Sequence, residues 1–247
     1  MKKIISFIPS LITSFNLICG ALATILALQD EVLIAVFFIL SATIFDFLDG
    51  FLARLLHATS EFGKQMDSLS DLISFGFAPT ALLYNLISNS NPQYCNCRYF
   101  AFVSILIVVF SALRLAKFNI DTEQSNEFRG LPTPASAIFF VSICLYSKEN
   151  PNAFLTNNLF TNNIFISIII IVISLLMVSR IKLLALKFKK FSLKKYFWQI
   201  ILILFSIFFL IFFKILGLGL IIIFYICISI IKNIFSKNKR NEVHRTN

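Results

Sequence analysis

The sequence has few charged residues: Asp, Glu, Lys and Arg make up 14% of its 247 residues, whereas 58% are hydrophobic and the mean hydropathy is +0.85. It also contains no sequence repeat, low-complexity tract or soluble domain. The low content of charged residues, together with the high hydropathy, excludes a water-soluble globular protein. Several apolar runs instead approach or exceed the length of about 18 residues that indicates a membrane-spanning helix. The sequence therefore predicts an all-α, polytopic membrane protein, in which most side chains face lipid or other helices.

Cysteine and histidine are scarce as well, with five and two residues. Cys19, Cys144 and Cys227 fall within apolar runs and are expected to act as small apolar side chains. Cys95 and Cys97 form a CNC stretch, but no histidine lies nearby, and a disulfide between them would be strained. The cysteines therefore give no indication of a metal site.

Eight apolar segments predict about eight transmembrane helices. They lie near residues 10–28, 32–55, 68–88, 98–117, 133–148, 162–180, 196–212 and 216–232. The last two must form a tight hairpin around Lys214 to Gly219, and the alternative is one long span followed by an interfacial piece. We expect a core over residues 1–195, followed by a hairpin and a basic tail over residues 196–247.

The basic residues predict the orientation, because cytosolic loops carry an excess of Lys and Arg. With a cytosolic N-terminus, 19 of the 22 basic residues fall on the cytosolic side, and the exceptions are Arg98, Lys148 and Lys214. Both termini of this multi-pass protein are therefore expected on the cytosolic side of the cell membrane. The net charge of +10 lies next to the predicted spans, so membrane lipids with anionic headgroups are the expected partner, and nucleic acid is not. Residues 182–197 are predicted to lie along this interface as an amphipathic helix or linker, with a solvated loop as the alternative.

Four aspartates interrupt the apolar pattern within DFLDGFLARLLHATSEFGKQMDSLSD, which spans residues 46–71. Asp46 and Asp49 are three residues apart, and Asp67 and Asp71 are four apart, so each pair shares one helix face. Asp46 and Asp49 lie roughly 22 and 27 Å into the second span, close to the cytosolic boundary of a hydrocarbon core about 30 Å thick. Since the chain then reverses into the third span, we expect all four carboxylates to meet at one depth.

These acidic groups need compensation, because an aspartate at the centre of a membrane costs about 2.5–3.5 kcal/mol even on an insertion scale. The carboxylates are either protonated or neutralised by cations. Oxygen ligands in this number suit Mg²⁺ or Mn²⁺, and two such ions would leave coordination positions for a diphosphate. We therefore predict a site for two ions formed by Asp46, Asp49, Asp67 and Asp71.

Small residues and an arginine accompany the aspartates. Gly50 and Ala53 are small, so they leave space on one helix face where a ligand would approach. Arg54 is placed to reach a phosphate. Gly63 lies in the predicted chain reversal, where it can leave space or adopt a positive φ. The structural alternative is close helix packing by small residues with some aspartates as helix caps, but it does not explain why all these residue types share one register.

The segment from Asp46 to Asp71 resembles the CDP-alcohol phosphatidyltransferases, whose motif is D-x2-D-G-x2-A-R-x8-G-x3-D-x3-D. All eight fixed positions are present at that spacing. The resemblance implies a core of six helices, with the C-terminal hairpin as an addition, and a homodimer. It also implies the transfer of a phosphoalcohol group from CDP-diacylglycerol, or a related CDP-alcohol, to a second alcohol, with release of CMP.

The same resemblance implies a role for each residue of the motif. Asp46, Asp49 and Asp67 would be ligands of two metal ions, and Asp71 would lie near the ions and act as the general base. The residues implied in binding the nucleotide and its phosphates are Gly50, Ala53, Arg54 and Gly63, together with Asp46, Asp49 and Asp67.

Three further stretches, IPSLITSFNLICG, SALRLAKFN and FRGLPTPASA, resemble segments of phosphatidylserine synthases within this family. Departures are mild, with Ser10 where Asn is common, Lys117 in place of Arg and Thr133 in place of Ser. The resemblance implies L-serine as the acceptor. Arg114 and Lys117 could meet its carboxylate or the lipid phosphate, and Asn119 offers both a donor and an acceptor. The alternative is that these are ordinary cytosolic basic residues and a polar cap.

Two other functions stay open at this point. A phosphatidylglycerophosphate or phosphatidylinositol phosphate synthase would need an additional basic pocket, which Arg114, Lys117 and Arg129 could supply. A cation transporter would distribute acidic residues through the membrane depth. The sequence instead gathers four of its 12 acidic residues at one level, which favours the enzyme.

Overall fold

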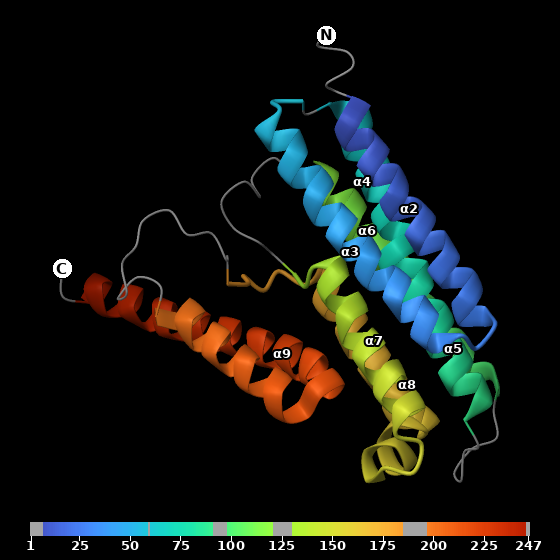
Figure 1. Ribbon diagram of the computed structural model, residues 1–247. Helices are drawn as coiled ribbons and strands as arrows, with labels where there is room; N and C mark the ends of the chain where they lie inside the picture. The colour runs from blue at the N-terminus through green and yellow to red at the C-terminus, as the bar shows by residue number, and fades with distance from the viewer. Residues whose placement is uncertain (1–6, 59, 91–97, 121–129, 185–196, 246–247) are drawn as a thin grey trace.

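The computed structural model describes residues 7–58, 60–90, 98–120, 130–184 and 197–245 (Figure 1). Within these ranges every regular element is a helix, and no strand forms. Three predictions made above fall on residues outside these ranges: those for the CNC stretch, for Arg129 and for most of the basic stretch 182–197.

The helices follow one another along the chain with short connections. Their bounds are α2 Phe7–Leu28, α3 Val32–Leu55, α4 Glu61–Asp71, η1 Leu72–Phe77, α5 Ala78–Asn89, η2 Arg98–Ser104, α6 Ile105–Ile120, α7 Thr133–Glu149, η4 Thr156–Phe160, α8 Asn163–Val178 and α9 Phe197–Arg245. Each of the eight predicted spans corresponds to one helical rod, if the two arms of α9 are taken separately.

The prediction of an all-α membrane protein is confirmed. Among the described residues, four helical segments are long and apolar enough to cross a membrane. They are Pro9–Leu28, Val32–Leu55, Tyr99–Ile120 and Phe197–Ile234. Large apolar side chains on the outer faces of these helices are exposed, as for Phe37 at 64% and Phe47 at 66% in α3. Such faces suit contact with lipid, because in a bilayer the apolar side chains need no cover of protein.

The third rod begins earlier than the predicted 68–88, because α4 starts at Glu61 and continues through η1 into α5. Ser60 caps this helix, and its hydroxyl accepts a 3.0 Å hydrogen bond from the backbone N–H of Gly63. Serine is a favoured N-cap, and Glu61 in the first turn adds a favourable charge. The expectation that Gly63 lies in the chain reversal is therefore wrong: Gly63 is in the first helical turn, and its φ is not positive. The positive φ of this turn belongs to His57, at 49°.

Small residues let α2 approach the third rod closely. A Cβ added at Gly20 would lie 2.6 Å from the Cα of Ser74 in η1, which no real side chain tolerates. Ala23 and Ala27, one and two turns further along α2, are fully buried. This contact brings the polar residues of α2 next to the third rod, and it places the start of α2 at the same end of the bundle as the turn between α3 and α4 (Figure 1).

The C-terminal helix α9 folds back on itself, so the predicted hairpin is confirmed and a single long span is excluded. The reversal occurs at Lys214, whose φ is 48° and ψ −119°. The two arms pack through Phe205 and Phe224, with ring centroids 4.7 Å apart. The hairpin lies beside α7 (Figure 1), where a Cβ at Gly219 would come 2.4 Å from the Oγ of Ser142.

Candidate metal and phosphate site

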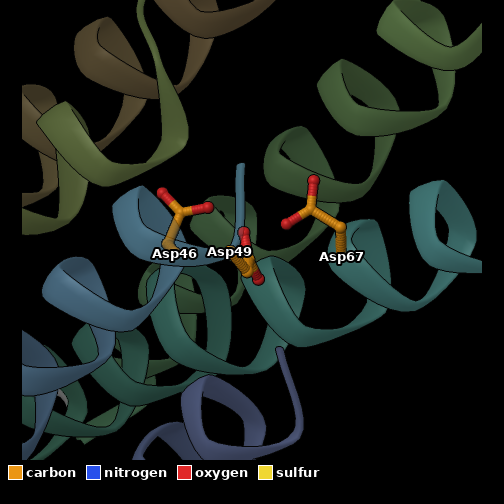
Figure 2. Close-up of side chains that lie close together, drawn as sticks. All are labelled: Asp46, Asp49 and Asp67. Atoms are coloured by element: carbon orange, nitrogen blue, oxygen red, sulfur yellow. The ribbon is translucent and has the colours of Figure 1, made fainter. Parts of the chain in front are cut away.

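Three aspartates converge where α3 and α4 face each other. Asp46 and Asp49 come from α3 and Asp67 from α4, and their carboxylates point into a shared space (Figure 2). One carboxylate oxygen from each lies within 4.8 Å of the others. The helical spacing of Asp46 and Asp49 places both on the side of α3 that faces the third rod. Two helices thus supply a compact set of oxygen atoms.

Asp71 lies beside this group, although it is not one of the three that converge. Its side chain is only 7% exposed, and the charges of Asp46, Asp67 and Asp49 all act on it. Asp71 ends α4, and the wider π-helical turn η1 begins at the next residue. Such turns are frequent at functional sites. Here the turn follows the aspartate that the family resemblance assigns as the general base.

Helix α2 holds two of the aspartates with polar side chains that sequence reasoning left unassigned. The hydroxyl of Thr13 donates to Asp49 Oδ2 at 2.6 Å, and Asn16 Nδ2 donates to Asp71 Oδ1 at 3.3 Å. Ser74 donates to Asn16 Oδ1 at 2.7 Å, which leaves the amide N–H₂ of Asn16 directed at Asp71. Thr13 and Asn16 are three residues apart in an apolar helix, so they lie on one face. This spacing is the feature of the sequence that could have pointed to a role for them in the site.

A cavity of about 440 Å³ opens on one side of the aspartates. Its lining includes five residues of the motif, namely Asp49, Gly50, Ala53, Gly63 and Asp67. A Cβ added at Gly50 would meet no heavy atom within 4 Å, so this glycine borders open space and is not required for helix packing. The cavity is large enough for part of a nucleotide, and the small residues of the motif make room for it.

The basic and polar residues predicted to bind substrate do not all reach this cavity. Arg54 and Lys117 are exposed, and neither lines it. Asn119 instead ties α6 to α4, because its side chain donates to Ser68 Oγ at 2.8 Å and its carbonyl accepts from Lys64 Nζ at 2.9 Å. These three residues therefore lie at the margin of the site.

Arg114 is different, since it is half-buried on the other side of the aspartates, and its Nε is fully buried. Its Nη1 donates to Thr133 Oγ1 at 3.2 Å, and its charge interacts with those of Asp71 and Asp46. Asp46 and Asp71 do not line the cavity that contains Gly50. The site thus has two sides: a cavity next to Asp49 and Asp67 that is large enough for part of a nucleotide, and the half-buried guanidinium of Arg114 next to Asp46 and Asp71.

The donor set of the site fits divalent cations. All the converging ligand atoms are carboxylate oxygens, which Mg²⁺ and Mn²⁺ prefer. Within the described ranges the one salt bridge joins Lys148 to Asp30, so none of these aspartates forms a salt bridge with a lysine or arginine, and Arg114 acts on Asp46 and Asp71 from beyond that distance. A cluster of partly buried acidic groups without a salt bridge is suited to binding cations.

Comparison with known proteins identifies the family. The family model for "CDP-alcohol phosphatidyltransferase" matches residues 6–178. The chain belongs to this family. All four aspartates and the residues between them lie within the matched region, whereas the C-terminal hairpin lies beyond it.

Curated relatives of this CDP-alcohol phosphatidyltransferase come from bacteria and archaea. The chain is 37% identical over 152 residues to a CDP-diacylglycerol–serine O-phosphatidyltransferase of Helicobacter pylori, and this alignment covers 61% of each chain. It is 37% identical over 144 residues to the Bacillus subtilis protein of the same name, covering 57% of this chain and 73% of the relative. It is 40% identical over 151 residues to an archaetidylserine synthase of Methanothermobacter thermautotrophicus, covering 58% of this chain and 61% of the relative. The chain thus spans about three fifths of the length of the first of these relatives.

Proposed function

We propose that this protein transfers the phosphatidyl group of CDP-diacylglycerol to the hydroxyl of L-serine, which yields phosphatidylserine and CMP. The observation that carries the proposal is the convergence of Asp46, Asp49 and Asp67 within 4.8 Å beside an open cavity. Membership of the CDP-alcohol phosphatidyltransferase family supports the reaction type. The names of the relatives, all of which refer to serine transfer or to archaetidylserine, support the acceptor.

Asp46, Asp49 and Asp67 would hold two divalent cations, either Mg²⁺ or Mn²⁺, and Asp71 would contribute from the adjoining position. When bound, such ions supply positive charge that neutralises a diphosphate and stabilises a departing phosphate oxygen. The cavity beside Asp49 and Asp67 would then take the nucleotide. A Cβ at Gly50 would have no neighbour within 4 Å, so the glycine lets the backbone of α3 come close to the nucleotide.

Asp71 would act as the general base. The serine hydroxyl oxygen attacks the phosphorus that bears diacylglycerol, the bond from this phosphorus to the oxygen of CMP breaks, and the hydroxyl proton passes to Asp71. The hydrogen bond from Asn16 to Oδ1 of Asp71 would hold the carboxylate in place for this step. The buried position of Asp71 excludes bulk water from competing with serine.

Arg114 would bind the acceptor. Its guanidinium lies on the side of Asp46 and Asp71, away from the cavity that Gly50 lines, and arginine is suited to pair with a carboxylate. Lys117 and Asn119 would contribute less, because one is exposed and the other is engaged with Ser68 and Lys64. In the same proposal Arg54, at the exposed end of α3, contacts a substrate phosphate at the membrane surface.

The proposal extends to location and assembly. The protein would be a multi-pass protein of the cell membrane, with both termini and the aspartates on the cytosolic side, where water-soluble serine and CMP exchange. Its catalytic core would span residues 1–195, and it would form a homodimer. These statements follow from the distribution of basic residues and from the family resemblance.

The test is CMP release by the purified protein in lipid nanodiscs that contain CDP-diacylglycerol. We expect release that requires both serine and Mg²⁺ or Mn²⁺, and that stops with EDTA. Incorporation of glycerol 3-phosphate or inositol phosphate in place of serine would reassign the acceptor within the family. Cation flux without CMP release would overturn the enzyme assignment in favour of a transporter.

A further inference from the structure

The second arm of the hairpin α9 carries three polar residues that face the same way, Tyr225, Ser229 and Asn233. They are spaced by four residues, so they form one stripe along a helix that is otherwise largely apolar. The hairpin lies beyond residue 178, where the family match ends. Its polar stripe therefore belongs to a part of the chain to which the family assigns nothing.

All three residues of this stripe bind one segment of backbone after α8, residues 182–184. The hydroxyl of Tyr225 donates to the carbonyl of Leu184 at 3.1 Å, and Ser229 Oγ accepts from the N–H of Leu184 at 3.1 Å. Asn233 Nδ2 donates to the carbonyl of Lys182 at 2.6 Å. Since this segment is not helical and its Leu183 and Leu184 are buried, its backbone groups need hydrogen-bond partners from elsewhere in the protein. The hairpin supplies them and thereby fixes the segment.

The fixed segment leads back to the acceptor side of the site. The carbonyl of Ile181 accepts a 2.9 Å hydrogen bond from the N–H of Gly130. Gly130 has a φ of 76°, and a Cβ there would lie 2.3 Å from the carbonyl oxygen of Met177. Three residues further on, Thr133 begins α7 and accepts from Arg114 Nη1. Hydrogen bonds and a short stretch of chain thus connect the hairpin to Arg114.

The guanidinium of Arg114 depends on this connection. Its Nη1 bonds to Thr133 at 3.2 Å, and its Nε is buried and has no hydrogen-bond partner among the described residues. Few polar groups therefore hold the guanidinium, and the position of Thr133 matters to it. The hydroxyl of Tyr225 supports that position indirectly, because it holds Leu184 in the segment that binds Gly130.

We infer that the hairpin α9 braces the acceptor side of the site through residues 182–184, and that Tyr225 is a positioning residue that, by holding Leu184, keeps Arg114 oriented toward the carboxylate of the acceptor. The inference rests on the proposed function, because it assigns Arg114 to acceptor binding. It adds that residues outside the family's shared core set the affinity for the acceptor. Removing the phenol oxygen should therefore weaken acceptor binding and leave the nucleotide side unchanged.

The experiment compares Tyr225→Phe with the wild-type protein in nanodiscs, and determines KM for serine, KM for CDP-diacylglycerol and kcat. We expect KM for serine to rise about fivefold, as for loss of one hydrogen bond between neutral groups, while the other two constants stay within about twofold. Tyr146→Phe is the matched control, because Tyr146 lies in α7, away from Arg114, and packs on Phe160. It should leave all three constants unchanged.

A double-mutant cycle separates positioning of Arg114 from general damage to the fold. In an Arg114→Lys background, Tyr225→Phe should raise KM for serine no further. An unchanged KM for serine in Tyr225→Phe, an equal rise in both KM values, or full additivity with Arg114→Lys would each overturn the inference. If Tyr225→Phe is recovered in too small a yield, Ser229→Ala replaces it, with the same pattern expected at about threefold. Failure of the wild-type protein to use serine would contradict the proposed function instead, and the cycle would then be measured with the alcohol that does release CMP.

Discussion

The aspartate cluster and the C-terminal hairpin both contain polar groups within an apolar protein, but these groups find their partners in different ways. In the cluster, carboxylates from α3 and α4 lie close together without a basic partner at salt-bridge distance in the described chain, and α2 holds two of them through Thr13 and Asn16. In the hairpin, neutral polar side chains satisfy an irregular backbone segment. A membrane protein retains polar groups only where they have partners. The carboxylates of the cluster leave room for a bound cation, whereas the polar side chains of the stripe already have backbone partners. The cluster is therefore suited to binding a ligand, and the stripe to stabilising the fold.

The largest effect is expected from a change within the cluster. Asp67→Asn should lower CMP release by about 1,000-fold or more, because the charge stabilisation that bound metals supply is worth several kcal/mol. The measurement is the initial rate at saturating Mg²⁺. Asp30→Asn is the control, since Asp30 is half exposed and pairs with Lys148 away from the site; its rate should stay within about twofold. Equal losses in both variants would mean that the cluster has no special role.

The next effect concerns the support that α2 gives to the cluster. Asn16→Ala removes the amide that donates to Asp71, and we expect a loss in kcat of about 10- to 100-fold, typical of residues that orient a ligand. Thr24→Ala is the matched control, because the Thr24 hydroxyl bonds only to the carbonyl of Gly20 within its own helix. A rate for Asn16→Ala that matches the control would contradict the orienting role.

Two glycines sharpen the distinction between packing and ligand space. Gly20→Ala places a Cβ against the backbone of Ser74 and should destabilise the fold by about 1–3 kcal/mol, as overpacking does. Gly50→Ala meets no neighbour, so it should leave thermal stability unchanged while KM for CDP-diacylglycerol rises about fivefold, or about 1 kcal/mol. Thermal unfolding in detergent and steady-state kinetics measure the two effects. Destabilisation by Gly50→Ala would mean that it packs against protein.

The smallest effect is expected at the margin of the site. Lys117 is exposed, so Lys117→Gln should change KM for serine by less than about twofold, because an exposed charge contributes little. Arg114→Gln, at the half-buried position in the same helix, should raise KM for serine by at least about tenfold. Equal effects of the two substitutions would show that burial does not distinguish them.

Contacts within one helix could be predicted from the sequence, and contacts between distant helices could not. The spacing of Asp46 and Asp49 placed both on one face of α3, and the apolar runs predicted the helical rods and the hairpin. The hydrogen bond from Asn16 to Asp71 joins residues 55 positions apart, and no periodicity determines which neighbour an amide meets. The start of α4 was missed for a local reason, since the N-cap at Ser60 was obscured by the polar residues around it.

The hairpin also makes contacts with distant segments that the sequence could not predict. Its existence followed from an apolar run too long for one span, but the partners of Tyr225, Ser229 and Asn233 depend on where the chain returns after α8. Arg114 was singled out from its basic type and its likeness to a family segment. Its separation from the exposed Lys117 became visible only with the packing of α6 against η1 and α8.

The central claim is that Asp46, Asp49 and Asp67 bind divalent cations. Electron paramagnetic resonance of Mn²⁺ titrated into the protein in nanodiscs, with CDP-diacylglycerol present, tests it most directly. We predict two bound ions per chain in the wild-type protein and their loss in Asp46→Asn and Asp67→Asn, with binding retained in Asp30→Asn. Mn²⁺ binding that is absent from the wild-type protein, or equal in all four proteins, would contradict the account.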